Sequence, residues 1–454
     1  MDKSKNSSSA YIVAADMGYG HQRALYPFLD IAAVPKEWNL EKPIIITANN
    51  YPTIPSEDRK AWELMQKGYE FVSRLNGFPV LGKRIFRAMD YFQRILPFYP
   101  KRDLSRPSLQ LKNFYRMIGK GLGKHLIETL NKNPLPFLTS FFVAAFFAEE
   151  HGYKGPIYCL CTDSDVSRAW APLNPQKSNI TYLAPNKRVK DRLMMYGVIP
   201  EKIIVTGFPL PQELIGDRET MDVLKKNLSC RIKKLDPKGI YQEKYEKVIH
   251  SYLGVQETDC EVKPISITFA IGGAGAQTEI GVAVLHSLAE HIRKGVLKLT
   301  LVAGTSRKVL EKFQYHIRNE GLEEYLGKNI HILFHTDKMA YFEEFNKLLA
   351  TTDILWTKPS ELSFYTGLGL PILMCPPLGS QEEFNRSWIH SLGSGIGQRD
   401  PEYASEWLFE WIESGWFAKA AMSGFLDAPK KGTYHIEDLI LRGEKTEIRN
   451  IHLI

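Results

Sequence analysis

The stretch DILWTKPSELSFYTGLGLPILMCPPLGSQEEFN, residues 353–385, contains two short apolar runs, each followed by a turn and a helix-like segment. The runs DILWT (353–357) and LPILMC (370–375) have the length and the aliphatic content of buried strands. A strand that is followed by a helix and then by another strand is typical of a parallel β-sheet. The stretch therefore predicts an α/β fold.

The same alternation extends in both directions from this stretch. In the first half, strand-like runs lie at 11–15, 43–48, 136–140, 156–162, 180–184 and 202–207. In the second half, they lie at 264–271, 297–304, 329–335, 353–357 and 370–375. Because the pattern stops and restarts, we predict two Rossmann-like parallel-sheet domains that face each other.

The domain boundaries follow from where this alternation is interrupted. The predicted first domain covers 1–210 and carries a basic amphipathic insertion at about 81–124. A charged, less regular linker or insertion covers 211–262, and the second domain covers 263–400. The aromatic segment 401–454 is expected to be a helical tail that packs across both halves.

Each half begins with a strand that runs into a glycine-rich turn and then a helix. The first is IVAADMGYGHQRAL (12–25), which brings Gly18, Gly20 and His21 together, and the second is FAIGGAGAQTEIG (269–281). Glycine lets the backbone turn tightly and approach a ligand, and the following helix offers free N–H groups to an anion. The two turns therefore predict two ligands that meet between the halves. A tight turn with a partly solvated histidine remains the alternative for the first.

Two common nucleotide-binding motifs are excluded at the first turn. Arg23 stands where a dinucleotide-binding fingerprint has its third glycine. The next strand ends in Thr47, Ala48 and Asn49, so it offers no acid to a ribose. A P-loop is excluded as well, because no Gly-Lys-Ser/Thr follows the glycines.

The stretch 353–385 resembles the donor-site signature of GT-B glycosyltransferases, in particular those similar to monogalactosyldiacylglycerol synthase and the peptidoglycan N-acetylglucosaminyltransferase. The matching residues are Lys358, Pro359, Ser360, Ser363, Gly369, Pro371, Pro376, Gln381 and Asn385. Four other segments resemble that family in the same order along the chain: DMGYGH (16–21), CTDSDVSRAW (161–170), YLAPNKRVKDRLMMYGVIPEKIIVTGFPL (182–210) and HILFHTDKM (331–339). The resemblance covers most of the chain apart from 217–262.

This sequence departs from the family pattern at three places. Thr366 stands where relatives have a glutamate that binds the donor ribose, and Glu361 lies five positions earlier. Ser360 replaces a glycine, and Arg168 lies near the position of a histidine found in the galactolipid synthases. The departures affect site residues and not the strands that define the fold.

The resemblance implies a metal-independent hexosyltransferase without a cofactor, which moves a sugar from a UDP-sugar to a lipid or other hydroxyl acceptor. Its acceptor-side loop would contain Gly18, Gly20 and Arg23, with either His21 or Asp163 as the general base. Its donor side would contain Gly272, Gly273, Gly275, Gln277, Phe334, Met339, Lys358, Ser360, Glu361, Thr366, Gln381 and Asn385. Alternative roles stay open: His21 as a phosphate ligand, Asp163 as a helix N-cap, and Gln381 and Asn385 as a solvated helix face.

Two other functions and one other site remain as alternatives. A nucleotide-sugar epimerase shares the two-domain fold, and a non-catalytic nucleotide-sugar-binding protein is favoured by Thr366. Asp163-Ser164-Asp165 has the Asp-x-Asp form with which a different glycosyltransferase fold binds a divalent metal. That fold has no second glycine loop, so the sequence favours a site without metal.

The basic charge of the chain is concentrated in one segment. Residues 83–124 contain eleven Lys or Arg and two acids, whereas the whole chain carries a net charge of +7. From Leu81 to Leu96, apolar residues recur at helical spacing between the basic ones. This pattern is typical of an interfacial helix on anionic lipid, and equally of a helix packed on its own domain. No nucleic-acid-binding module accompanies the charge, so a nucleic-acid partner is not expected.

Three features predict a cytoplasmic protein, with peripheral membrane attachment through 81–124 left open. The polar start MDKSKNSSS lacks the apolar core of a signal peptide. The most apolar segment, LPFLTSFFVAAFFA (135–148), is shorter than the ~20 residues of a spanning helix. The five cysteines have no framework spacing, which indicates reduced thiols.

Overall fold

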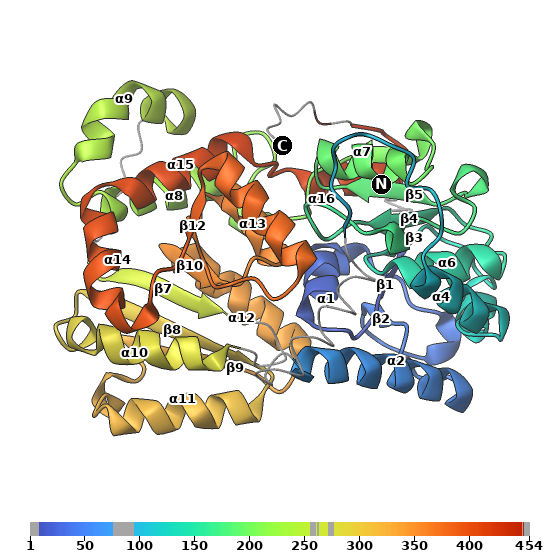
Figure 1. The fold of residues 1–454 in the computed structure, drawn as a ribbon, viewed down its shortest axis with the longest axis horizontal. Coiled ribbons are helices and arrows are strands. Elements are labelled where there is room, and N and C mark those ends of the chain that lie inside the picture. The colour runs from blue at the N-terminus through green and yellow to red at the C-terminus, as the bar shows by residue number, and fades with distance from the viewer. Residues whose placement is uncertain are drawn as a thin grey trace, which may run out of the picture. The chain divides into compact units, whose positions relative to one another are not determined.

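The computed structural model describes residues 9–75, 95–254, 260, 263–270, 277–446 and 448. The chain divides into two compact units. The first contains Met1–Pro209 together with Gly379–Phe384 and Lys431–His452, and the second contains Leu210–Leu378 and Asn385–Lys430, with Leu453–Ile454. Each unit is built on one six-stranded sheet in which all paired strands are parallel (Figure 1). The prediction of an α/β fold with two Rossmann-like parallel sheets is confirmed.

The first sheet has the strand order β2-β1-β3-β4-β5-β6. Its strands are β1 (Tyr11–Ala14), β2 (Ile46–Thr47), β3 (Phe137–Thr139), β4 (Ile157–Leu160), β5 (Thr181–Ala184) and β6 (Ile203–Val205). Each lies inside one of the apolar runs of the sequence, and β1 and β3 are buried along their whole length. The chain leaves β1 toward β2 and later returns to the other side of β1 with β3, so the strand order reverses between β1 and β3.

Within the described residues, six helices accompany the first sheet, and a seventh returns to it late in the chain. They are α1 (Tyr19–Leu25), α2 (Ser56–Leu75), α4 (Leu109–Gly119), α5 (Lys124–Leu130), α6 (Phe142–Glu150), α7 (Lys187–Met195) and α16 (Gly432–Arg442). Ser108 and Asn186 cap α4 and α7 by accepting backbone N–H groups with their side chains. The apolar segment of the sequence ends in α6, a nine-residue helix that is buried from Val143 to Ala148.

The second sheet has the strand order β12-β11-β10-β7-β8-β9. Its strands are β7 (Ile265–Ala270), β8 (Leu297–Gly304), β9 (Ile330–Phe334), β10 (Ile354–Thr357), β11 (Ile372–Met374) and β12 (Gly395–Gly397). The apolar pattern predicts all of them except β12, whose glycines carry no strand signal. A Cβ at Gly395 would lie 2.4 Å from the carbonyl oxygen of Ile372, so this edge strand pairs closely because it has no side chain there.

The helices of the second unit lie on both faces of its sheet. They are α8 (Asp222–Leu235), α9 (Ile240–Leu253), α10 (Thr278–Arg293), α11 (Arg307–Asn319), α12 (Lys338–Thr351), α13 (Ser380–Leu392), α14 (Ala404–Glu413) and α15 (Trp416–Asp427). Right-handed crossovers place α10 and α11, which precede the return to β10, on one face, and α12 on the other. Figure 1 shows α10 and α11 side by side. The strand order reverses between β7 and β10.

Segment 211–262, which the sequence suggests is a linker or insertion, contributes α8 and α9 to the second unit, where α8 packs against α15. The C-terminal tail is divided between the two units: α14 and α15 belong to the second unit, and α16 packs against the first.

The expectation of reduced thiols is wrong for Cys230 and Cys260. These two residues, 30 positions apart in the sequence, form a disulfide with their Cα atoms 5.5 Å apart. The cysteine spacing did not predict this pair, because Cys230 lies in α8 and Cys260 follows α9, and only the path of the chain through both helices brings them together. Cys159, Cys161 and Cys375 are buried and lie outside this disulfide.

Candidate functional site

In an open α/β sheet, ligands bind outside the carboxyl ends of the strands, at the point where the strand order reverses. In the first sheet this point lies between β1 and β3. The first glycine turn follows β1 there, and Gly18 has φ 117°, a left-handed conformation that favours glycine. Helix α1 begins directly after it and contains His21. The sequence therefore places His21 at the expected ligand-binding edge of this sheet.

His21 is held by the residue that follows β3. Its Nδ1 lies 2.8 Å from the carbonyl oxygen of Ser140, and the hydroxyl of Ser140 donates to the carbonyl of His21, also over 2.8 Å. The ring of Phe141 meets the imidazole edge-on, with centroids 5.1 Å apart. Ser140 is fully buried, whereas His21 is half-buried. The switch point of the first sheet thus presents an imidazole whose position is fixed from both strands.

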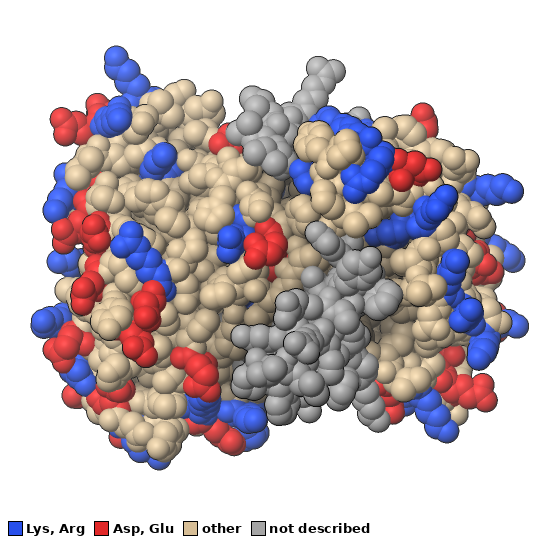
Figure 2. Space-filling view, viewed as in Figure 1, with Lys and Arg blue, Asp and Glu red and all other residues tan. Residues whose placement is uncertain are grey.

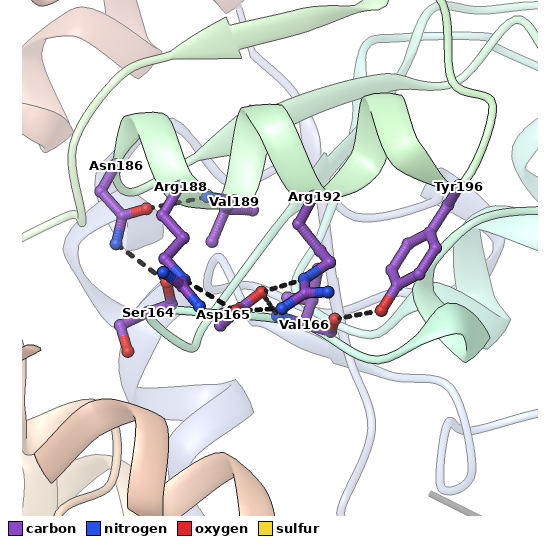
Figure 3. A network of polar contacts seen from close by, with 8 residues as sticks. All are labelled: Ser164, Asp165, Val166, Asn186, Arg188, Val189, Arg192 and Tyr196. Atoms are coloured by element: carbon purple, nitrogen blue, oxygen red, sulfur yellow. Dashed lines mark hydrogen bonds and ion pairs between the residues drawn. The ribbon is translucent and has the colours of Figure 1, made fainter. Parts of the chain in front are cut away.

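The other base candidate, Asp163, is half-buried in the turn after β4, the strand beside β3. The next acid, Asp165, has a different environment (Figure 3). Its carboxylate accepts hydrogen bonds from Arg192 Nε and Nη2, both over 2.8 Å, and from Arg188 Nε over 2.9 Å. Both oxygens are therefore committed to arginines, which makes Asp165 unsuited to bind a metal ion. Among the described residues, no group of three or more acids, histidines or cysteines is placed to hold one.

Two arginines near this site have structural partners. Arg168, near the position of the relatives' histidine, donates to the carbonyls of Ser105, Ala171 and Pro172. Burial lowers its pKa from the usual arginine value. Arg23 is almost fully buried, with its guanidinium 5.8 Å from the ring centre of Tyr19 in its own helix. Neither side chain is positioned like an exposed substrate ligand.

In the second sheet the strand order reverses between β7 and β10, and polar side chains tie together the segments that follow these strands. Thr357, the last residue of β10, donates to the carbonyl of Ala270, the last residue of β7, over 2.6 Å. Gln277, at the start of α10, donates to the carbonyl of Pro376 after β11 over 2.8 Å. Asn385 of α13 is fully buried and donates to the carbonyl of Pro359 over 3.2 Å. Hydroxyl and amide groups therefore tie Ala270, Pro359 and Pro376, which end or follow β7, β10 and β11, to neighbouring elements.

The remaining donor-side candidates differ in their exposure. Lys358, Ser360 and Glu361 follow β10 directly and are half-buried, with Glu361 opening a 3-10 helix, η8 (Glu361–Leu368). Thr366 lies in the same helix but is fully buried against α15, because a Cβ at Gly424 would lie 2.3 Å from its Oγ1. Thr366 therefore faces the core of the unit. Its position does not offer a side chain to a ligand.

Phe334 and Met339 are half-buried at the carboxyl end of β9 and the start of α12, two strands from β7. Gln381 is half-buried in the first turn of α13. Gly272, Gly273 and Gly275 lie outside the described residues. Ser140 and Phe141 were not predicted as site residues, although Ser140 is the last residue of the predicted strand 136–140. No local pattern marks a residue whose partner is 119 positions away.

Comparisons with known proteins find a relative in sequence and several solved structures of similar fold. Over 319 residues, 70% of this chain and 67% of the relative, the sequence is 19% identical to the processive diacylglycerol beta-glucosyltransferase of Bacillus subtilis. The chain resembles the GT-B glycosyltransferases. Residues 256–434 match a family described as a domain of unknown function, DUF6938.

Solved structures of similar fold include two that span nearly the whole chain. The S. aureus MnaA–UDP complex covers 97% of this chain and 99% of its own, at 12% identity and a TM-score of 0.47. Acinetobacter baumannii MurG covers 95% and 99%, at 12% identity and a TM-score of 0.45.

Proposed function

We propose that this GT-B-like protein is a glycosyltransferase that moves a hexose from a UDP-sugar to a hydroxyl acceptor, either a lipid or a small molecule. The observation that carries the proposal is the pair of topological switch points, each of which has polar residues beside it. His21 lies at the first switch point, within the loop that resembles the family's acceptor loop. Lys358 of the family signature lies at the second, together with Gln277 and Glu361. The curated relative's name gives diacylglycerol as its acceptor, so a lipid hydroxyl is the first acceptor to test.

Glycosyl transfer requires a base for the acceptor hydroxyl and positive or dipolar groups for the leaving diphosphate. The first unit offers His21 and Asp163 as bases, and the two remain alternatives. In the second unit, Lys358 and the backbone N–H groups of the glycine turn 271–276 would receive the diphosphate. The proposal assigns no step to a metal ion or a cofactor.

Replacement of His21 by alanine is expected to lower kcat about 100-fold or more, because the acceptor hydroxyl would lose its base. The assay follows sugar transfer from UDP-sugars to diacylglycerol and to soluble acceptors. His286→Ala, which changes an exposed histidine in the second unit, is the matched control and should leave kcat unchanged. A large loss in Asp163→Asn with little loss in His21→Ala would assign the base to Asp163 instead.

The same assay separates the alternative functions. A transferase forms product only when an acceptor is present, whereas an epimerase converts the nucleotide-sugar alone. A non-catalytic binding protein does neither, although it still binds the nucleotide. Conversion of the nucleotide-sugar without an acceptor would therefore contradict the transferase and support the epimerase.

UDP is expected to bind more tightly than GDP or ADP, and with equal affinity in the presence of EDTA. In the relatives, a glutamate at the position of Thr366 binds the ribose. Thr366 is buried and cannot take its place, so we assign this contact to Glu361, whose carboxylate follows β10 closely. Glu361→Gln should weaken UDP binding about 10-fold or more, since a hydrogen bond to a charged group contributes roughly 1.5–3 kcal/mol. Isothermal calorimetry measures this, with the exposed Glu324→Gln as control. Tighter binding of another nucleotide would overturn the UDP assignment.

A basic surface of the first unit supports peripheral attachment to anionic lipid. The N-terminal part of the basic amphipathic segment, 81–94, lies outside the described residues. Residues 101–104 of the remainder lie beside α7: Leu104 donates its N–H to the carbonyl of Met195, and Lys101 Nζ lies 3.8 Å from Asp191 Oδ2. Tyr99 is 68% and Leu109 70% exposed. Figure 2 shows Lys and Arg side chains gathered over the region of α7. Within the described residues, no helix is long and apolar enough to cross a bilayer.

The protein is expected to co-sediment with anionic vesicles at low salt and to be released at high salt, because each basic residue near the surface contributes ~1 kcal/mol. The double charge reversal Lys101→Glu/Lys187→Glu should weaken this binding by at least tenfold. The matched control reverses Arg307 and Lys308, two exposed cations on α11. Equal binding by both double variants, or no binding by the unaltered protein, would argue against this surface.

A further inference from the structure

We propose that Ser140 is a positioning residue, which holds His21 in the tautomer that carries its proton on Nδ1 and presents a lone pair on Nε2. The inference rests on the proposed transfer, because it assigns the atom of His21 that would take the acceptor proton. The inference also has geometric support that does not depend on the transfer: both hydrogen bonds between His21 and Ser140 join the segments that follow β1 and β3.

The tautomer follows from the chemistry of the contact. The Ser140 carbonyl oxygen can accept a hydrogen bond but cannot donate one. With 2.8 Å between this oxygen and Nδ1, the nitrogen must carry the hydrogen. A neutral imidazole has a single N–H, so its other nitrogen, Nε2, is the acceptor. The tautomer that the pair selects is therefore the one in which Nε2 can act as a base.

The ring is held in this position by two further contacts. The Ser140 hydroxyl donates to the His21 carbonyl over 2.8 Å, which fixes the backbone of α1 to the end of β3. Strand β3 is itself paired with β1, with Thr139 opposite Val13. The edge of Phe141 restricts rotation of the imidazole. Because a carbonyl is neutral, this contact selects the tautomer without adding a negative charge.

The first test reads the tautomer directly, through long-range ¹H–¹⁵N correlations of the histidine side chains in the full-length protein. We expect His21 to be protonated on Nδ1 in the unaltered chain. Ser140→Ala keeps the main-chain carbonyl that accepts from Nδ1 and removes only the hydroxyl bond to the His21 carbonyl, so it should loosen the contact and add a minor form protonated on Nε2. His435 serves as an internal reference, since its Nδ1 lies 3.0 Å from the carbonyl of Thr206 and should not change. A proton on Nε2 of His21 in the unaltered chain would overturn the proposal, whether or not transferase activity is found.

The second test asks whether Ser140 acts through His21. Ser140→Ala is expected to lower kcat about tenfold with little change in KM, as loss of roughly 1.4 kcal/mol would do, and Ser140→Thr should restore it. In the His21→Ala background, Ser140→Ala should cost nothing further, because coupled residues are not additive. Equal losses in both backgrounds, or a fall in kcat that matches a fall in thermal stability, would reduce Ser140 to a structural residue. If the unaltered protein and every variant transferred no sugar, the proposed function would be contradicted. The tautomer of His21, which the first test reads directly, would not be affected by that result.

Discussion

Introducing the relatives' glutamate at position 366 is expected to unfold this protein or to leave it barely stable. Thr366 is fully buried in η8, and its Oγ1 has no hydrogen-bond partner among the described residues. A longer side chain would be forced against Gly424 of α15, and its carboxylate would lie in the core without a cation. Thr366→Glu should therefore lower the free energy of unfolding by about 4 kcal/mol or more, a large part of the ~5–15 kcal/mol of a typical protein.

Chemical denaturation measures this effect, and Thr366→Val is its matched control. Valine has nearly the shape of threonine and removes a buried hydroxyl that makes no hydrogen bond, so its unfolding free energy should be unchanged or about 1 kcal/mol higher. A stable Thr366→Glu variant that binds UDP more tightly would show that position 366 faces the donor ribose, as in the relatives. That outcome would remove the reason for assigning the ribose contact to Glu361.

Replacement of Asp165 by alanine is expected to cost about 3–5 kcal/mol of unfolding free energy, because it leaves the buried guanidinium of Arg192 without its counter-ion. The same change would loosen the turn that carries Asp163, since Asp165 also accepts the N–H of Val166. Asp191→Ala on α7, beside Arg192, is the matched control. Asp191 pairs with exposed Lys187 and Lys101, so its loss should cost less than about 1 kcal/mol.

The comparison of these two variants also tests the metal alternative for Asp163-Ser164-Asp165. If Asp165 were a metal ligand, Asp165→Ala would reduce metal-stimulated activity while the metal-free protein kept or gained stability, since a repulsive charge would be gone. A large loss of stability in metal-free buffer is the result that the arginine contacts predict. Equal stability of the Asp165→Ala and Asp191→Ala variants would contradict them.

The sequence by itself determined the α/β class, eleven of the twelve strands that the described residues form, and the position of His21 after β1. These features are local, because an apolar run of strand length or a glycine after it is encoded by neighbouring residues. β12 escaped prediction because its Gly-Ile-Gly has no strand propensity, and pairing with β11 alone makes it a strand.

Tertiary structure alone decided the partners and the burial of the site residues. Ser140 reaches His21 only because β1 and β3 pair, and Asp165 becomes a buried ion-pair partner only because α7 packs over its turn. The disulfide joins Cys230 of α8 to Cys260, which lies 30 positions later. Thr366 is buried because η8 packs against α15 at Gly424, far along the chain. Hydrogen bonds, ion pairs and close packing join residues by distance in space, and a linear pattern carries no measure of that distance.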